Sequence, residues 1–184
     1  PWLPTIETAA ALEQRVIGLI LVKLDSAEHV TPEDFYQVGT VARMHQLARN
    51  DGRLQFIAQG LRRFRIERWL SSEPPYHVQV TYLDEEREAV SDDELRAYSL
   101  AVINTLKELI PLNPLYSEEL KFFLNRFNTN DPSPLADFAA SLTTASKAEL
   151  QEILATAPVL ERMKQVMVLI KKELEVAQLQ TKIR

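Results

Sequence analysis

The fold of the N-terminal half is decided by residues 38–59, which read VGTVARMHQLARNDGRLQFIAQ. The Asn-Asp-Gly run at 50–52 interrupts this stretch, and Gly52 supplies the positive φ that a tight hairpin turn requires. After the turn, apolar side chains alternate with polar ones, as in a strand with one buried face: Leu54, Phe56 and Ala58. The stretch therefore predicts a β-hairpin with strands over 38–49 and 53–59.

The segments around this hairpin predict further strands. Residues 63–67 and 76–82 alternate in the same way, and the two prolines at 74–75 mark the turn between them. The β-branched run at 16–22 predicts a buried strand, and Gly60 predicts a bulge or turn. Short helical segments are expected at residues 6–15 and 32–36. With about five strands joined by short turns, this half is expected to form a small, mostly antiparallel sheet or partial barrel.

Residues 91–184 contain no glycine and read as helix almost throughout. Ser91 with Glu94, and Ser146 with Glu149, have the spacing of a capping box and predict two helix starts. The first of these helices is expected to end before Pro111. Two more helices are expected, one over residues 120–127 and one starting at Ser133-Pro134 with proline at its first position.

The last helix is expected to start near Pro158 and to run to the end of the chain. Its apolar residues repeat at spacings of three and four, which is the pattern of a heptad seam: Leu160, Met163, Met167, Ile170, Leu174 and Ala177. About 26 helical residues would span roughly 40 Å. This is more than a small bundle needs, so the C-terminal part is expected to project outward.

An acidic stretch at residues 84–94 separates the two halves and is interpreted as a solvated linker running into a helix start. The chain is therefore expected to be α+β, with a β-rich domain over residues 1–88 and a helical bundle over residues 89–184.

Composition restricts the class of protein. The chain has 184 residues, of which 46% are hydrophobic and 26% charged, as in a folded globular protein. A net charge of -5 argues against a protein that coats nucleic acid. The absence of cysteine excludes disulfides and thiolate metal sites and favours the cytoplasm. No apolar run is long enough to span a membrane, and no signal peptide is visible.

The motifs of common enzymes are missing. No phosphate-binding P-loop, dinucleotide fingerprint, nucleophile elbow or Ser-x-x-Lys motif occurs. The three histidines lie in separate segments without ligand spacing: His29, His45 and His77. We therefore expect this chain by itself to have no catalytic site, no bound metal and no cofactor.

Several motifs, taken together, resemble one family, the Lon proteases. The motifs lie at residues 38–44, 50–52, 60–66, 75–78, 112–114 and 149–184. In this order they are similar to the N-terminal substrate-binding domain of Lon, which is PUA-like, and to the helices that lead toward its ATPase module. Lon proteins usually open with a Leu-Pro-Leu-Arg-like strand and a Phe-Pro-Gly turn. This chain opens with Pro1-Trp2-Leu3-Pro4 directly before its first helix, so an exposed sheet edge is expected.

The resemblance implies a non-catalytic region of an ATP-dependent serine protease. It implies binding of unfolded or damaged protein substrates, and support for a homo-oligomeric, hexameric ring. The Ser-Lys dyad, and the ATP and Mg²⁺ sites, would then belong to the parent enzyme beyond residue 184.

A surface that captures varied unfolded chains needs accessible apolar groups and flexible side chains such as methionine. Five residues are candidates for contact with substrate or partner: Trp69, Pro75, Tyr76, Met163 and Met167. Intramolecular packing is the alternative for all five. The two methionines could also form a seam along which the last helix pairs with another copy.

Two other functions stay open. Four arginines lie near one predicted strand and could meet the phosphates of a nucleic acid: Arg62, Arg63, Arg65 and Arg68. Strand alternation predicts Arg63 and Arg65 on one face, and Arg62 and Arg68 on the other. The second possibility is a structural spacer that sets the geometry of a ring without touching substrate.

Overall fold

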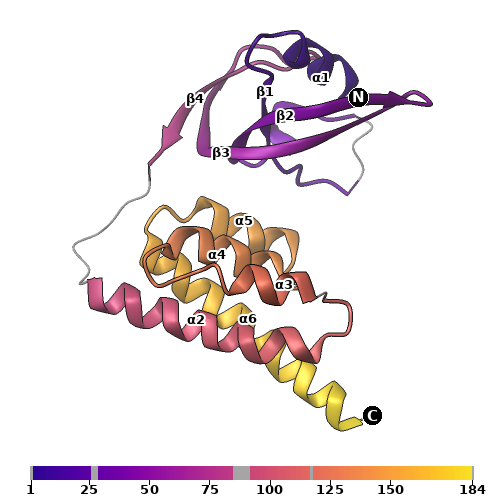
Figure 1. Cartoon of the computed structure of the whole chain (residues 1–184). Coiled ribbons are helices and arrows are strands. Elements are labelled where there is room, and N and C mark those ends of the chain that lie inside the picture. The colour runs from indigo at the N-terminus through magenta and orange to yellow at the C-terminus, as the bar shows by residue number, and fades with distance from the viewer. Residues whose placement is uncertain (1, 26–28, 85–91, 117, 184) are drawn as a thin grey trace. The chain divides into compact units, whose positions relative to one another are not determined.

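The chain forms two compact units, Pro1–Asp84 and Glu85–Arg184. The computed structural model describes residues 2–25, 29–84, 92–116 and 118–183. The first unit holds an antiparallel sheet and the second is helical, ending in a long helix (Figure 1). The predicted α+β class is therefore confirmed. The expected boundary between residues 88 and 89 lies outside the described residues.

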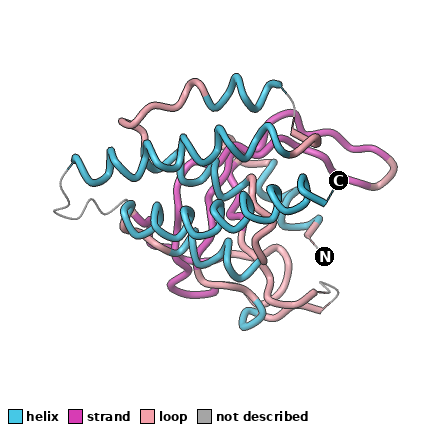
Figure 2. Tube along the Cα trace, turned by 90° about the horizontal axis from the view of Figure 1, so that it is seen from below, coloured by secondary structure: helices cyan, strands magenta, loops and turns pink. Residues whose placement is uncertain are grey.

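The sheet of the first unit has four strands in the order β1-β2-β3-β4, and all neighbours are antiparallel. The elements are α1 (Leu3–Ala10), β1 (Val16–Leu19), the 3-10 turn η1 (Pro32–Asp34), β2 (Val38–Asn50), β3 (Arg53–Trp69) and β4 (Val78–Leu83). The predicted hairpin is confirmed as β2 and β3, with a positive φ at Gly52. Figure 2 shows its far end as a two-stranded ribbon that extends beyond the other strands.

The expectation of about five strands was wrong because two predicted strands are one. The predicted segments 53–59 and 63–67 both belong to the continuous β3. Gly60 lies opposite Ala42, and Arg62 lies opposite Val41, so one residue is inserted between them as a bulge. A bulge bends a strand without ending it, and this explains why the alternation restarts after Gly60.

The first strand and first helix also differ from their predictions. The expected buried strand at 16–22 is β1, which ends at Leu19 and pairs with β2 alone. As an edge strand it leaves Gly18 and Leu19 exposed. The helix expected at 6–15 is α1, which starts at Leu3 because Pro4 is tolerated in a first turn.

Phe64 of β3 packs on the bare backbone of the two preceding strands. Its side chain is only 3% exposed. A Cβ atom added to Gly39 would lie 2.9 Å from Phe64 Cζ and 2.4 Å from the Leu19 carbonyl oxygen. A Cβ atom added to Gly18 would lie 3.0 Å from Phe64 Cζ. The absence of side chains at these two positions therefore lets the Phe64 ring approach the sheet.

We expect Gly39→Ala to lower the free energy of unfolding by about 3 kcal/mol, because the new methyl group would overlap a backbone oxygen that cannot move alone. Gly60→Ala is the matched control, since its Cβ would meet Thr40 Cγ2 at 3.4 Å, an ordinary contact. The control should change the stability by less than about 1 kcal/mol. Urea unfolding followed by circular dichroism measures both, and equal effects would contradict the expectation.

The second unit contains five helices among its described residues. They are α2 (Asp92–Leu112), α3 (Glu118–Leu124), α4 (Pro132–Ser141), α5 (Lys147–Ala155) and α6 (Val159–Ile183). The start of α6 near Pro158 is confirmed. The end of α2 was predicted two residues too early, since Pro111 lies within its last turn. The start of α4 was predicted too late, because Pro132 also fits a first turn, where amide hydrogens have no helical partner.

The capping box at the start of α5 is confirmed. The Ser146 hydroxyl accepts a hydrogen bond from the Glu149 amide at 3.2 Å, and the Ser146 amide donates to Glu149 Oε1 at 3.1 Å. The hydrogen bond from the Ser146 backbone is the main reason that the pKa of the Glu149 carboxyl lies below its ordinary value. The other predicted box includes Ser91, which lies outside the described residues.

The heptad seam of α6 faces the core of its own unit. Met163, Val166 and Ile170 are fully buried, and α6 packs against α2 and α4. Beyond Ala177 every described residue of α6 is exposed. The last turns of α6 extend past the other helices of this unit, as expected (Figure 1).

Arg162 of α6 is fully buried and joins three helices. Its Nε and Nη2 atoms donate to the Thr156 carbonyl oxygen at 3.1 and 3.0 Å, at the end of α5. Its Nη1 atom donates to the Ser133 hydroxyl at 2.8 Å, in the first turn of α4. A planar guanidinium carries its N–H donors in a fixed fork, which lets Arg162 bond both helix ends at once.

We expect Arg162→Ala to lower the free energy of unfolding by about 3 kcal/mol, because it leaves buried oxygens without donors and opens a cavity. Arg96→Ala, at an exposed position of α2, is the control and should cost less than about 0.5 kcal/mol. Thermal and urea unfolding give both values. A cost for Arg162→Ala no larger than that of the control would show that the buried guanidinium does not stabilise the unit.

Candidate functional site

Four aromatic side chains from distant parts of the first unit form one cluster. Phe35 is at its centre, with ring centroids 4.9 Å from Trp69, 5.9 Å from Tyr76 and 5.9 Å from Trp2. Trp69 and Tyr76 also meet edge to face at 5.9 Å. Phe35 is 7% exposed, whereas the other three rings keep part of their surface accessible. The cluster therefore combines a buried anchor with an accessible aromatic wall.

A bulge in β3 places Trp69 in this cluster. Ile66 lies opposite Val80 and Arg68 lies opposite Gln79, so Glu67 is the extra residue. The insertion puts Trp69, which lies opposite Val78, on the same face as Ile66. Trp69 is three positions after Ile66. Without the bulge, regular alternation would therefore place the two side chains on opposite faces of β3.

Ser71 organises the connection that carries Tyr76. Its hydroxyl donates to the Pro75 carbonyl oxygen at 3.0 Å and accepts a hydrogen bond from the His77 amide at 2.9 Å. The Tyr76 amide donates to the Thr5 hydroxyl at 3.1 Å, which joins this connection to α1. The backbone around Tyr76 is thus held from both sides.

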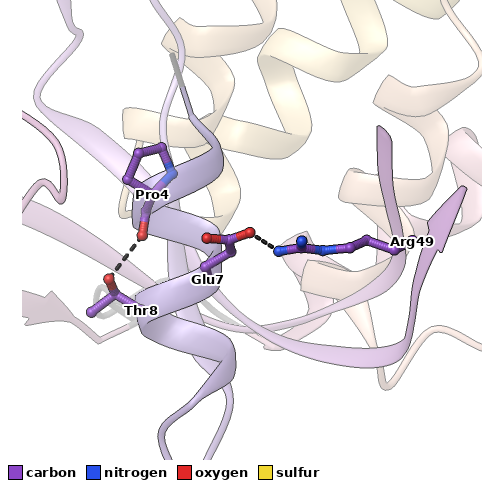
Figure 3. A network of polar contacts seen from close by, with 4 residues as sticks. All are labelled: Pro4, Glu7, Thr8 and Arg49. Carbon is purple, nitrogen blue, oxygen red and sulfur yellow. Dashed lines mark hydrogen bonds and ion pairs between the residues drawn. The ribbon is translucent and has the colours of Figure 1, made fainter. Parts of the chain in front are cut away.

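A second contact fixes α1 to the hairpin. The Glu7 carboxylate points toward the Arg49 guanidinium near the far end of β2, and the two groups form an ion pair (Figure 3). Within α1, the Thr8 hydroxyl donates to the Pro4 carbonyl oxygen at 2.8 Å. Together with the bond from Tyr76 to Thr5, the ion pair ties both the hairpin and the β3–β4 connection to this short helix.

These elements enclose a cavity of about 520 Å³ within the first unit. Its walls are α1, the β1 segment, the aromatic cluster and the inner face of β3, which contributes Phe56, Phe64 and Ile66. Most of the lining is apolar; the side chains with polar groups include Thr5, Thr8 and His77. The volume and lining are typical of a site that takes an apolar ligand or side chain.

The structure brings three of the five predicted contact residues together. Trp69, Pro75 and Tyr76 all line this cavity. Met163 and Met167 do not join them, because they are 0% and 8% exposed in the core of the helical unit. Their packing is the intramolecular alternative, so neither side chain offers an accessible surface.

Sequence reasoning missed Trp2 and Phe35. Trp2 precedes α1, and Phe35 follows the turn η1, so neither lies in an alternating pattern that would assign it to a face. The sequence offered only a weak indication of their role, because each is an aromatic residue beside a helical turn with a proline at or near its start. Only the fold brings them within reach of Trp69.

The arginines are distributed differently from the prediction. Arg63, Arg65 and Arg68 lie opposite Leu83, Thr81 and Gln79, which share one face of β4. The expectation that Arg68 shares a face with Arg62 was wrong, because the bulge at Glu67 reverses the alternation. Arg62 pairs with Asp84 at 3.0 Å and lies over the Tyr82 ring at 4.3 Å from its centroid.

The described residues contain neither a metal-binding cluster nor a membrane-spanning helix. Within residues 2–25, 29–84, 92–116 and 118–183, no group of three acidic, histidine or cysteine side chains could hold a metal ion. None of the helices in these ranges has the length and apolar character needed to cross a membrane.

Similar proteins point to one family. Residues 3–172 match the family model of the ATP-dependent protease La (LON) substrate-binding domain. Lon protease 2 of Hydrogenovibrio crunogenus is 45% identical over 183 residues, covering 100% of this chain and 21% of that protein. Lon protease 1 of Syntrophotalea carbinolica is 45% identical over 170 residues, covering 92% of this chain and 21% of that protein. The chain thus spans about a fifth of the length of these relatives.

The fold is found in solved structures as well. The N-terminal domain of a Mycobacterium avium complex Lon protease superposes with a TM-score of 0.67 at 25% identity, covering 91% of this chain and 83% of that one. A Lon N-terminal domain protein from Xanthomonas campestris, at 19% identity and a TM-score of 0.51, shares the fold. The sequence match and the fold agree, and the chain belongs to the family of Lon substrate-binding domains.

Proposed function

We propose that this domain recognises unfolded or damaged protein substrates by taking one of their apolar side chains into the cavity of the first unit. The observation that carries the proposal is the accessible aromatic wall formed by Trp69, Tyr76 and Trp2 around that cavity. An unfolded chain differs from a folded one in its exposed apolar groups, so an apolar cavity distinguishes the two.

The chemistry of the wall suits varied ligands. Aromatic faces and edges accept aliphatic and aromatic side chains alike, without requiring a fixed pattern of hydrogen bonds. A cavity of about 520 Å³ holds one large side chain and part of its neighbour. Selection would then depend on apolar character rather than on a defined sequence.

A single cavity of this kind binds weakly. Burying about 150 Å² of apolar surface contributes about 4 kcal/mol, which corresponds to a dissociation constant of about 1 mM before the costs of association. Useful affinity requires several cavities acting on one chain. This supports a homo-oligomeric parent, a hexamer by resemblance, whose ATP- and Mg²⁺-dependent protease domains lie outside these residues.

We expect Tyr76→Ala and Ala9→Leu each to weaken binding of a fluorescein-labelled, unfolded Leu- and Phe-rich peptide at least about tenfold. The first removes part of the wall; the second fills the cavity from α1 with a helix-favouring residue. Tyr82→Ala, at a tyrosine of β4 that does not line the cavity, is the control and should bind as the unchanged chain does. Fluorescence anisotropy gives the affinities, and circular dichroism shows that each variant is folded.

A labelled single-stranded DNA in low salt tests the nucleic-acid alternative. Three arginines share one face of β3, so Arg65→Glu would remove salt-sensitive DNA binding if that surface were functional. The proposal requires that Arg65→Glu leave the peptide affinity unchanged and that the two cavity variants lower it. Equal peptide affinities for Tyr76→Ala, Ala9→Leu and the control would contradict the proposed substrate site. A chain that binds neither the peptide nor the DNA would favour a structural spacer.

A further inference from the structure

The helix α3 and the turn after it carry an exposed stripe with opposite charges at its two ends. Glu119, Phe122, Phe123 and Arg126 follow one another at positions i, i+3, i+4 and i+7, so they lie on one side of the helix. The helical turn continues past Leu124, because the Arg126 amide donates to the Phe123 carbonyl oxygen at 3.1 Å. Along the helix, the stripe therefore consists of an acidic residue, two phenylalanines and a basic residue.

The middle of this stripe is unusually accessible for aromatic residues. Phe122 is 66% exposed and Phe123 is 44% exposed. Phe123 is anchored from below by edge-to-face contacts with Phe127 and Phe138, at 5.4 and 5.2 Å between ring centroids. Phe122 is held from the side by the Arg126 guanidinium, 5.4 Å from its ring centroid. Both rings are thus held on a surface that water covers.

We propose that this stripe pairs with the same stripe of a second copy of the chain, antiparallel, about a two-fold axis. The midpoint between Glu119 and Arg126 falls between Phe122 and Phe123. An antiparallel copy centred there puts each Glu119 opposite the partner's Arg126 and sets the phenylalanines of the two copies against each other. A surface that is complementary to itself in this way is what a two-fold interface requires.

The charges favour a second copy over an unfolded client. A client chain of arbitrary sequence offers no fixed acid and base about 10 Å apart, whereas a second copy of this helix always does. In an antiparallel pair each Glu119 faces an Arg126, whereas in a parallel pair like charges would face each other. The charges therefore also select the orientation. The cavity of the first unit has no such charge pattern.

The contact is expected to be weak by itself. Four phenylalanines, two from each copy, and two exposed ion pairs bury less than the roughly 1,200 Å² of a stable complex. By itself such a contact forms at high protein concentration, and it is strengthened where other contacts already hold the copies close, because a high effective concentration compensates for low affinity. It therefore fits an accessory link within an oligomer, and it is independent of what the cavity binds.

Charge reversal tests the pairing on the complete 184-residue chain by sedimentation velocity at increasing concentrations. Glu119→Arg and Arg126→Glu should each weaken self-association at least about tenfold, because each sets like charges against each other. The double variant with both changes should restore it to within about threefold, because the opposite charges then face each other again. Lys107→Glu, at an exposed position of α2, makes the same charge change as Arg126→Glu away from the stripe and should leave self-association unchanged.

Phe122→Glu should abolish self-association without loss of helical circular dichroism, since the side chain is already exposed. A chain that stays monomeric at every concentration overturns the proposal, and so does a double variant that is as weak as the single ones. Peptide binding to the cavity is measured on the same variants. It should not change, which separates failure of this pairing from failure of the proposed substrate site.

Discussion

The packing of Phe64 on the bare backbone of β1 and β2 is the constraint on which the first unit depends. The ring occupies the space where side chains at Gly18 and Gly39 would lie, so it forms the floor of the cavity and joins three strands. Because the tip of the ring packs against the backbone at these two glycines, space is left over the inner face of β3. Ile66 and Trp69 therefore line the cavity and do not fill it. A bulkier residue at Gly39 would move Phe64 into that volume and close the site.

Prediction succeeded where a local rule acts alone. The hairpin followed from Gly52 and the alternation beside it, and the start of α5 followed from the reciprocal spacing of Ser146 and Glu149. Prediction failed where a bulge intervenes. One extra residue at Glu67 reverses the alternation, so Arg68 and Trp69 each lie on the face opposite to the one that simple counting gives. No local signal marks Glu67 as the inserted residue, because the bulge is selected by how β3 pairs with β4.

The candidate site illustrates the same limit. Trp69, Pro75 and Tyr76 were identified because they lie close together in sequence, at a turn between strands. Trp2 and Phe35 come from segments that only the folded chain brings near them. For Met163 and Met167 the heptad pattern correctly predicted an apolar seam. Such a pattern indicates that the seam is buried, but not whether helices of the same chain or of a second copy cover it. The neighbouring helices α2 and α4 supply that cover, and Arg162 holds the start of α4 and the end of α5 against the same helix.

The two surfaces that stay accessible differ in a way that suits different partners. The cavity is apolar and has few polar groups, so it can discriminate by hydrophobicity but hardly by sequence. The stripe on α3 has fixed charges at fixed spacing, so it can discriminate by pattern although its apolar area is small. A domain that must accept many clients needs the first kind of surface for them, because a charge pattern would reject most sequences. The proposed pairing of copies uses the second kind, because a purely apolar contact between copies would compete with the clients for the same chemistry. Their separation onto different units lets either surface change without altering the other.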